Sequence, residues 1–151
     1  MFTDNQQISN LISIGGFILL FAGIWIGVTV LISKTSGWLS LSKTYRSLKP
    51  FNGRRWSYQN AQLRSGGLYG KCLTIGVNSE GLYLSVLFLF RIGHPPLFIP
   101  WSDIYIVEKE RMLLTIEFNF QRAPSVPLRI SKRLAHRMAE TAGRSWPGYK
   151  Q

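Results

Sequence analysis

The spacing of apolar residues divides the chain into one unbroken run followed by short alternating segments. From Leu11 to Ile32, all 22 residues lack a charged side chain. At ~1.5 Å per residue, a helix of this length extends roughly 33 Å and can cross a hydrocarbon core of about 30 Å. We therefore predict a transmembrane helix over residues 11–33, preceded by a short extracytoplasmic segment of residues 1–10. Because the leader has no basic residue and the run is longer than a signal-peptide core, no cleaved signal peptide is expected.

Residues 34–52 form a basic juxtamembrane segment. In a helix of about 3.6 residues per turn, its larger apolar side chains share one arc of about 80°: Trp38, Leu41, Tyr45 and Leu48. Lys43 and Arg46 fall on another face. This helix either lies in the lipid headgroup layer or folds back on the following domain, where the same arc would be core. Turn residues at 50–53 place the start of that domain at Gly53.

Short extended runs bounded by turn residues come next, a pattern typical of an all-β domain. The run 82–90 is rich in β-branched and aromatic residues, is too short for a second membrane crossing and stops at Arg91. In the run 113–120, apolar residues from Leu114 to Phe120 alternate with polar ones such as Glu117. We count seven strands in six runs, of which 97–110 contains two: 56–64, 68–77, 82–90, 97–110, 113–120 and 126–130.

The last element has helical spacing over residues 131–143. Ser131 is a favourable N-cap and Gly143 a natural stop. One side of this helix is apolar: Leu134, Ala135, Met138 and Ala142. Lys132 and Arg133 at its start oppose the positive end of the helix dipole. They either hold an anion there or are simply screened by solvent.

Charge is distributed unevenly along the chain. Only Asp4 is charged before residue 33, and the eighteen Lys and Arg residues after it face six acidic ones, a net charge of about +12. The positive-inside rule therefore predicts a single-pass protein of the inner (plasma) membrane, with its N-terminus outside and its domain in the cytoplasm. A basic domain tethered to a bilayer has anionic lipid as its nearest partner. The residues expected to contact lipid are Lys34, Lys43, Arg46, Lys49, Arg54 and Arg55.

Gly23 and Gly27 have the small-xxx-small spacing that lets two membrane helices approach closely. The pair indicates either helix packing, in a homodimer or against another membrane protein, or simply the high glycine content of membrane helices. Nucleic acid is a less favoured partner, because the aromatic residues are expected inside strands and not on a stacking platform.

The chain contains no recognisable catalytic motif. Cys72 is the single cysteine, which excludes an internal disulfide and a CxxC metal site and predicts an inert packed thiol. His94 has no matching ligand at metal-site spacing. The acidic residues that paired-carboxylate catalysis would need lie on predicted strands: Glu108, Glu110 and Glu117. We therefore expect no enzymatic activity, no metal and no cofactor.

Two segments carry a resemblance to the pleckstrin-homology-like (PH/GRAM-like) barrel found in small bacterial membrane-anchored proteins. Residues 81–84 (GLYL) enter the third strand, and residues 90–104 contain IPWSDI, which is similar to the h-P-W-x-x-I pattern before the fifth strand. The resemblance covers residues 53–143 and leaves a tail of residues 144–151. It implies a bent, half-open barrel with one corner closed by the C-terminal helix. Within it, we expect Trp101 to fill a barrel end and Asp103 to cap the next turn.

Eukaryotic members of this family often bind phosphoinositides through basic residues around the first hairpin. Arg64 and Lys71 flank that loop here, but Leu73 stands where a second base is needed, so the chain departs from the pattern. Diffuse attraction to anionic lipid does not depend on that base. The candidate anion-binding residues are Arg64, Lys71, Lys132 and Arg133.

These patterns together predict a single N-terminal transmembrane helix, a mainly-β PH-like barrel of about seven strands and a closing C-terminal helix. Two functions fit this architecture. The domain is either a non-enzymatic scaffold that binds the lipid surface and a protein partner, or a small accessory subunit of a larger membrane protein complex. No residue pattern specifies the protein partner or the lipid species.

Overall fold

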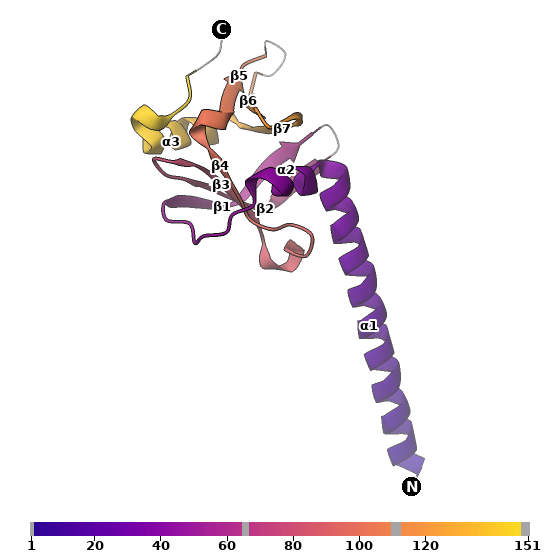
Figure 1. Ribbon diagram of the computed structural model, residues 1–151. Coiled ribbons are helices and arrows are strands. Elements are labelled where there is room, and N and C mark those ends of the chain that lie inside the picture. The colour runs from indigo at the N-terminus through magenta and orange to yellow at the C-terminus, as the bar shows by residue number, and fades with distance from the viewer. Residues whose placement is uncertain (1, 65–66, 110–112, 149–151) are drawn as a thin grey trace.

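One long helix, α1 (Phe2–Ser36), projects from the rest of the molecule (Figure 1). This computed structural model describes residues 2–64, 67–109 and 113–148. Within those ranges, α1 is the single helix that could cross a membrane by its length and composition. It begins earlier than the predicted span because the polar leader contains no proline or glycine to interrupt it.

A short second helix, α2 (Trp38–Tyr45), follows α1 after one glycine. Gly37 has a φ of +86°, and a Cβ there would lie 2.8 Å from both methyl carbons of Val126, so the turn requires glycine. Leu48, beyond the helix, is 89% exposed. The other three residues of the predicted arc pack against the domain and not in a headgroup layer, which agrees with the second of the two alternatives. The buried side chains of α2 are Trp38, Leu41 and Tyr45.

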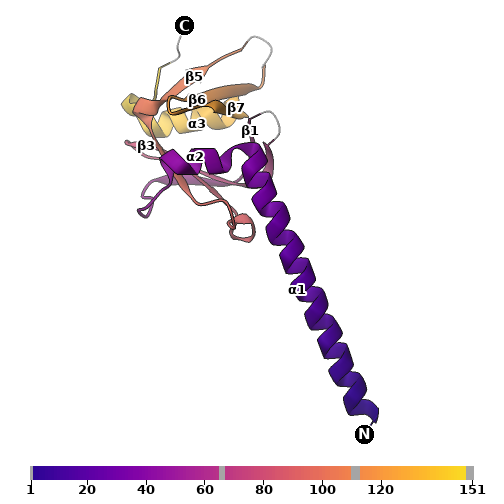
Figure 2. The ribbon, with the colours of Figure 1, turned by 45° about the vertical axis from the view of Figure 1, so that its right-hand side comes forward.

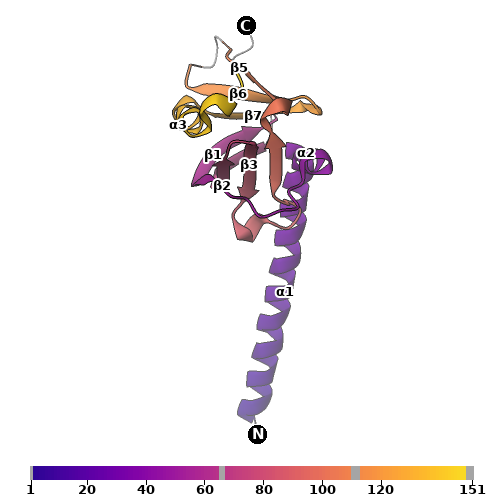
Figure 3. The ribbon, with the colours of Figure 1, turned by 60° about the vertical axis from the view of Figure 1, so that its left-hand side comes forward.

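Seven antiparallel strands form one sheet that curves into a nearly closed barrel (Figure 3). Their order across the sheet is β4-β3-β2-β1-β7-β6-β5. The short turn η2 (Trp101–Asp103) joins the two end strands directly, which confirms the predicted seven-stranded barrel. The strands are β1 (Arg54–Leu63), β2 (Gly67–Val77), β3 (Gly81–Val86), β4 (Leu97–Pro100), β5 (Ile104–Val107), β6 (Thr115–Phe120) and β7 (Ala123–Ser131).

β3 is shorter than the predicted strand 82–90. Its pairing with β2 ends where Val86 lies opposite Leu73. Lys71, just before that point on β2, has a φ of +53° and marks an irregular stretch. Without a partner strand the chain turns into the 3-10 helix η1 (Phe88–Phe90). The second half of this apolar run is therefore an exposed loop and not a core strand.

The C-terminal helix α3 (Lys132–Ala142) packs against β7, β6 and β2. Both predicted ends are confirmed: Ser131 Oγ accepts a hydrogen bond of 3.2 Å from Leu134 N, and Gly143, with a φ of +58°, follows the last residue. The apolar side of the helix joins the barrel core as predicted. Next to it, the ring of Trp101 lies 5.4 Å from that of Trp146.

Replacing Leu41, whose side chain is fully buried in the core, with alanine should test the place of α2 in the fold. We expect Leu41→Ala to lower the free energy of unfolding by about 2–5 kcal/mol, because it leaves a cavity. The matched control Leu48→Ala removes the same atoms from an exposed side chain and should change it by less than ~0.5 kcal/mol. Urea unfolding of the full chain in micelles, followed by tryptophan fluorescence, measures both. Equal effects would mean that α2 is not part of the core.

Candidate functional site: the junction of the long helix and the barrel

The last two turns of α1 are built into the barrel. Ser33 and Ser36 are fully buried and Thr29 is 3% exposed, whereas the large apolar side chains before them on α1 are exposed. Ser33 Oγ donates a hydrogen bond to the carbonyl of Gly93. Ser36 Oγ shares a hydrogen bond of 2.7 Å with the hydroxyl of Tyr69. These contacts fix the direction in which α1 leaves the barrel (Figure 2).

Tyr69 and His94 form a buried polar pair behind this contact. The Tyr69 hydroxyl lies 3.0 Å from Nε2 of His94, and Nδ1 of His94 lies 3.4 Å from the carbonyl of Ile92. A carbonyl can only accept, so these partners place the imidazole proton on Nδ1. Nε2 then accepts from Tyr69, which in turn accepts from Ser36. The network therefore has one direction, from serine through tyrosine to histidine.

Burial favours the neutral form of both groups. Desolvation raises the pKa of Tyr69 to about 12, although the hydrogen bond from Ser36 opposes the shift. Desolvation also lowers the pKa of His94 below its ordinary value. The ring of Trp38 covers both, with its centroid 5.6 Å from that of Tyr69 and 5.3 Å from that of His94. Cys72 is half-buried, and burial raises the pKa of its thiol, so the thiol stays protonated at neutral pH.

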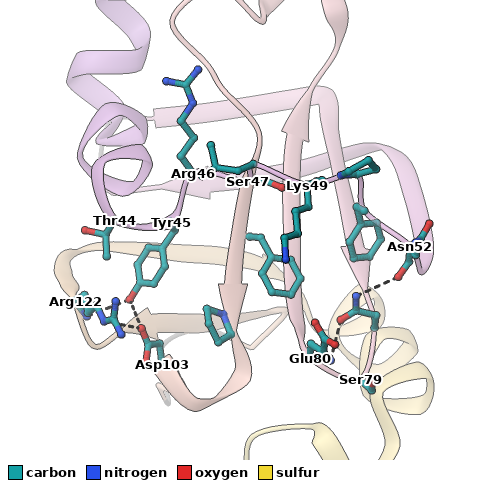
Figure 4. A pocket seen from close by; sticks show the side chains of 16 residues that line it. Thr44, Tyr45, Arg46, Ser47, Lys49, Asn52, Ser79, Glu80, Asp103 and Arg122 are labelled. Carbon is teal, nitrogen blue, oxygen red and sulfur yellow. Dashed lines mark hydrogen bonds and ion pairs between the residues drawn. The ribbon is translucent and has the colours of Figure 1, made fainter.

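A cleft of about 640 Å³ lies beside α2 (Figure 4). Its walls are the segment 44–52, the β2–β3 turn 78–80 and part of β4. The side chain of Lys49 extends over the cleft, while Arg46 points along β4 toward the loop that precedes it (Figure 4). The charged residues of the walls are Arg46, Lys49, Glu80, Asp103 and Arg122.

A polar cluster from three elements holds one wall of this cleft. The buried carboxylate of Asp103 accepts a hydrogen bond of 3.0 Å from the Tyr45 hydroxyl and pairs with Nε of Arg122 at 3.2 Å. The same hydroxyl accepts a hydrogen bond of 3.2 Å from Arg122 N. Asp103 therefore ties α2 to the β6–β7 turn. The sequence predicts a different contact for this residue, as the cap of the turn before Ile104. Its role is structural.

The six basic residues predicted to contact lipid are all exposed. Arg54 and Arg55 lie at the start of β1, where their guanidinium carbons stack 5.2 Å from the ring of Trp56 and 5.3 Å from the ring of Phe51. Arg55 also donates a hydrogen bond of 2.7 Å to Phe51 O. These two side chains therefore support the fold as well as carrying charge. The other four follow the path from α1 to β1: Lys34, Lys43, Arg46 and Lys49.

The predicted anion-binding residues occupy two places, with Arg64 and Lys71 beside the β1–β2 loop and Lys132 and Arg133 at the start of α3. Residues 65–66 of that loop lie outside the described residues. Arg64 Nε donates to Ser125 O at 3.3 Å, and Lys132 Nζ lies 3.8 Å from a carboxylate oxygen of Glu108. Among the described residues no contact joins the two pairs. A shared anion site stays a prediction.

Gly23 and Gly27 lie on the free part of α1, where a Cβ at either position would meet open space. The opposite side of the helix faces the barrel, since the Trp25 indole donates a hydrogen bond of 3.0 Å to Leu89 O. At about 100° per residue, both glycines point roughly away from Trp25 and Thr29. A neighbouring helix could therefore pack on the glycine face without displacing the barrel.

Glu117 is 4% exposed, although the alternation of β6 placed it on a polar face. Its carboxylate lies 3.0 Å from Arg129 Nε and 3.4 Å from Lys109 Nζ. Burial alone would raise the pKa of Glu117, but hydrogen bonds and the charge of Lys109 lower it overall. Glu110 lies outside the described residues. Within 2–64, 67–109 and 113–148, no group of three His, Cys, Asp or Glu side chains could hold a metal ion.

The fold and the junction together define a class: a small barrel domain joined through buried hydrogen bonds to one long apolar helix. No family model matches the chain, and neither a curated protein nor a solved structure matches it. Its function is therefore argued from the geometry of the junction, the cleft and the surface.

Sequence reasoning did not find the junction. Thr29, Ser33 and Ser36 follow one another at intervals of four and three residues, which puts three small polar side chains on one helix face. That stripe, at the end of an otherwise apolar run, was the available signal. Nothing local marked Tyr69 or His94 as its partners, because they come from a strand and a loop far along the chain.

The junction should weaken at acidic pH. The unfolded chain protonates His94 near its ordinary pKa of about 6.5, whereas the folded protein resists protonation because burial lowers that pKa. The stabilisation is therefore fully present above about pH 6.5 and is lost as the pH falls below it. Thermal unfolding midpoints between pH 8 and pH 5 should fall for the natural chain and fall less for His94→Gln, which keeps an acceptor for Tyr69. If the unfolding midpoints of the natural chain and of His94→Gln fell equally between pH 8 and pH 5, protonation of His94 would not be the cause.

Proposed function

We propose that this chain is a single-pass membrane protein whose PH-like domain is a non-enzymatic module that binds the anionic lipid surface and a protein partner. In this proposal α1 spans the inner membrane of a bacterium, with the N-terminus outside and the barrel in the cytoplasm. The excess of basic residues after α1 supports this orientation. The seven-stranded order and the C-terminal helix agree with the resemblance on which the PH-like assignment rests.

The observation that carries the proposal is the seating of α1 in the barrel. A flexible linker would let a tethered domain move away from the bilayer. Here Ser33 and Ser36 are hydrogen-bonded inside the domain, and only Gly37 separates α1 from α2. A barrel attached in this way stays at the membrane surface with one side always facing lipid.

Electrostatic attraction then acts on a surface that is already in place. Each basic residue near an anionic leaflet contributes about 1 kcal/mol. Lys34, Lys43, Arg46 and Lys49 occur along the path from the helix to β1 and are exposed. They would hold the α2 side of the barrel close to the headgroups.

The cleft is the place we assign to a protein partner. Strand addition at β4 is obstructed at its start, because Arg46 forms a bridge with Leu97 and Ser47 N donates a hydrogen bond of 2.8 Å to Pro96 O. An extended segment fits the cleft better, because the cleft is open between the segment 44–52 and the β2–β3 turn, and its walls offer both Lys49 and Glu80 for pairing with charged side chains (Figure 4). This mode uses groove binding instead of sheet extension.

A fluorophore on Leu48→Cys, in a Cys72→Ser background, should test the lipid part. In nanodiscs of the full chain, we expect headgroup-labelled quencher lipids to quench it more strongly when phosphatidylglycerol is present than in neutral lipid. Replacing the six predicted basic residues with glutamine, or adding salt, should remove that difference. Two matched double variants give the control. Lys43→Gln with Lys49→Gln should reduce the difference in quenching between anionic and neutral nanodiscs, and Arg137→Gln with Arg144→Gln should leave that difference unchanged. Unchanged quenching in the six-residue variant would reject lipid binding by these side chains.

The open glycine face favours a second function, that of an accessory subunit packed through α1 against another membrane helix. We expect Gly23→Leu with Gly27→Leu to lower the particle mass in mild detergent, measured by light scattering. The control pair Ile14→Ala with Ile18→Ala lies on the opposite side of the helix, is also exposed, and should leave the mass unchanged. A natural chain that is monomeric in mild detergent and in cells would exclude this function.

A further inference from the structure

The loop that contains η1 lies beside α1 and not beneath the barrel core. The Trp25 indole donates to Leu89 O at 3.0 Å, and its ring lies 5.2 Å from the ring of Phe90. Further along α1, Gly93 approaches Val30 so closely that a Cβ there would lie 3.3 Å from Val30 Cα. The three ribbon views agree that the loop descends along the helix (Figures 1, 2 and 3).

The tip of this loop is apolar and uncovered. Phe88 is 70% exposed, Leu89 50% and Ile92 48%. Neighbouring α1 residues at the same level, such as Phe21 and Ile24, are also apolar and exposed. The loop and the helix therefore form one continuous apolar surface, of the kind that marks a membrane contact.

The depth of Trp25 on the helix shows where this surface must lie. If α1 spans the bilayer from Leu11, the rise to Trp25 is about 21 Å, roughly 9 Å less than the hydrocarbon core of about 30 Å. Tilting the helix shortens the vertical rise and deepens Trp25 further. A loop bonded to Trp25 therefore lies within the lipid boundary.

The backbone of the loop is suited to an apolar environment, where unpaired carbonyls are costly. Five of its carbonyl groups accept hydrogen bonds within the protein: Leu87 O from Phe90 N at 2.9 Å, Phe88 O from Arg91 N at 3.3 Å, Leu89 O from Trp25, Arg91 O from His94 N at 2.9 Å and Gly93 O from Ser33. The side chain of Arg91 is exposed, and its Nε donates a hydrogen bond of 3.4 Å to Val86 O, at the barrel end of the loop.

We propose that residues 87–93 are a second membrane anchor, with Phe88, Leu89 and Ile92 inserted in the leaflet into which α1 emerges. The inference rests on the proposed membrane span of α1 but not on anionic lipid, because the contact is apolar. The barrel is then attached to the membrane at two points: the helix crosses the bilayer, and the loop holds the same side of the domain in the leaflet beside the helix.

The test uses the full chain in neutral phosphatidylcholine nanodiscs, with a fluorophore on Phe88→Cys or Ile92→Cys in the Cys72→Ser background. We expect quenching by acyl-chain doxyl lipids and a severalfold loss of quenching by aqueous iodide, relative to Leu114→Cys. Leu114 is 81% exposed and equally apolar, but it directly precedes β6, a strand at the end of the barrel opposite to the projecting α1 (Figure 1). Circular dichroism confirms that each labelled variant is folded.

A label on Leu19→Cys, on the free part of α1, separates the two proposals. Doxyl quenching at residues 19 and 88 together supports both. Doxyl quenching at residue 19 together with full iodide access at residue 88 overturns the second anchor alone. The second anchor is also overturned if the label at residue 88 is shielded from iodide but is not quenched by doxyl lipid, because protein then covers that label. No doxyl quenching at residue 19 overturns the membrane span itself.

Discussion

The hydrogen-bonded seating of α1 in the barrel is the contact on which the rest of the structure depends. Ser33 and Ser36 are small polar residues at the end of an apolar helix. Their hydroxyls form hydrogen bonds with Gly93 O and with the Tyr69 hydroxyl inside the domain. Buried hydroxyls without such partners would be costly. Because these partners belong to the domain, the helix direction, the position of α2 and the place of the η1 loop beside α1 follow from one set of contacts.

Small residues make this seating possible. A Cβ on Gly67 would lie 2.4 Å from Cβ of Ser36, and Gly93 faces Val30 with a φ of +78°. At both positions the barrel backbone approaches α1 more closely than a larger residue allows. The short turn at Gly37 then leads directly into α2, whose Trp38 covers the buried Tyr69–His94 pair. Close packing and the polar network therefore both join α1 to the barrel in this region.

Local patterns predicted much of the fold. The apolar run, the seven strands and both ends of α3 follow from spacing, turn residues and capping preferences, which act over a few neighbouring positions. Three features could not be predicted from local patterns, because they depend on partners far along the chain. These are the side on which the Trp38–Tyr45 arc packs, the end of the strand predicted over 82–90, and the direction of Glu117. The same holds for the junction, whose two halves are separated by more than thirty residues at Ser36 and Tyr69.

A barrel seated on its helix also limits where a partner can bind. The α1 side is occupied by the helix and the η1 loop, and α3 packs against the strands β6 and β7. The beginning of β4 is engaged by Arg46 and Ser47. The cleft between the segment 44–52 and the β2–β3 turn stays open, and its wall contains the Tyr45–Asp103–Arg122 cluster that ties α2 to the barrel. A ligand in the cleft would therefore contact α2, the same helix whose Trp38 covers the Tyr69–His94 pair, so in the proposed function the cleft and the junction share one structural element.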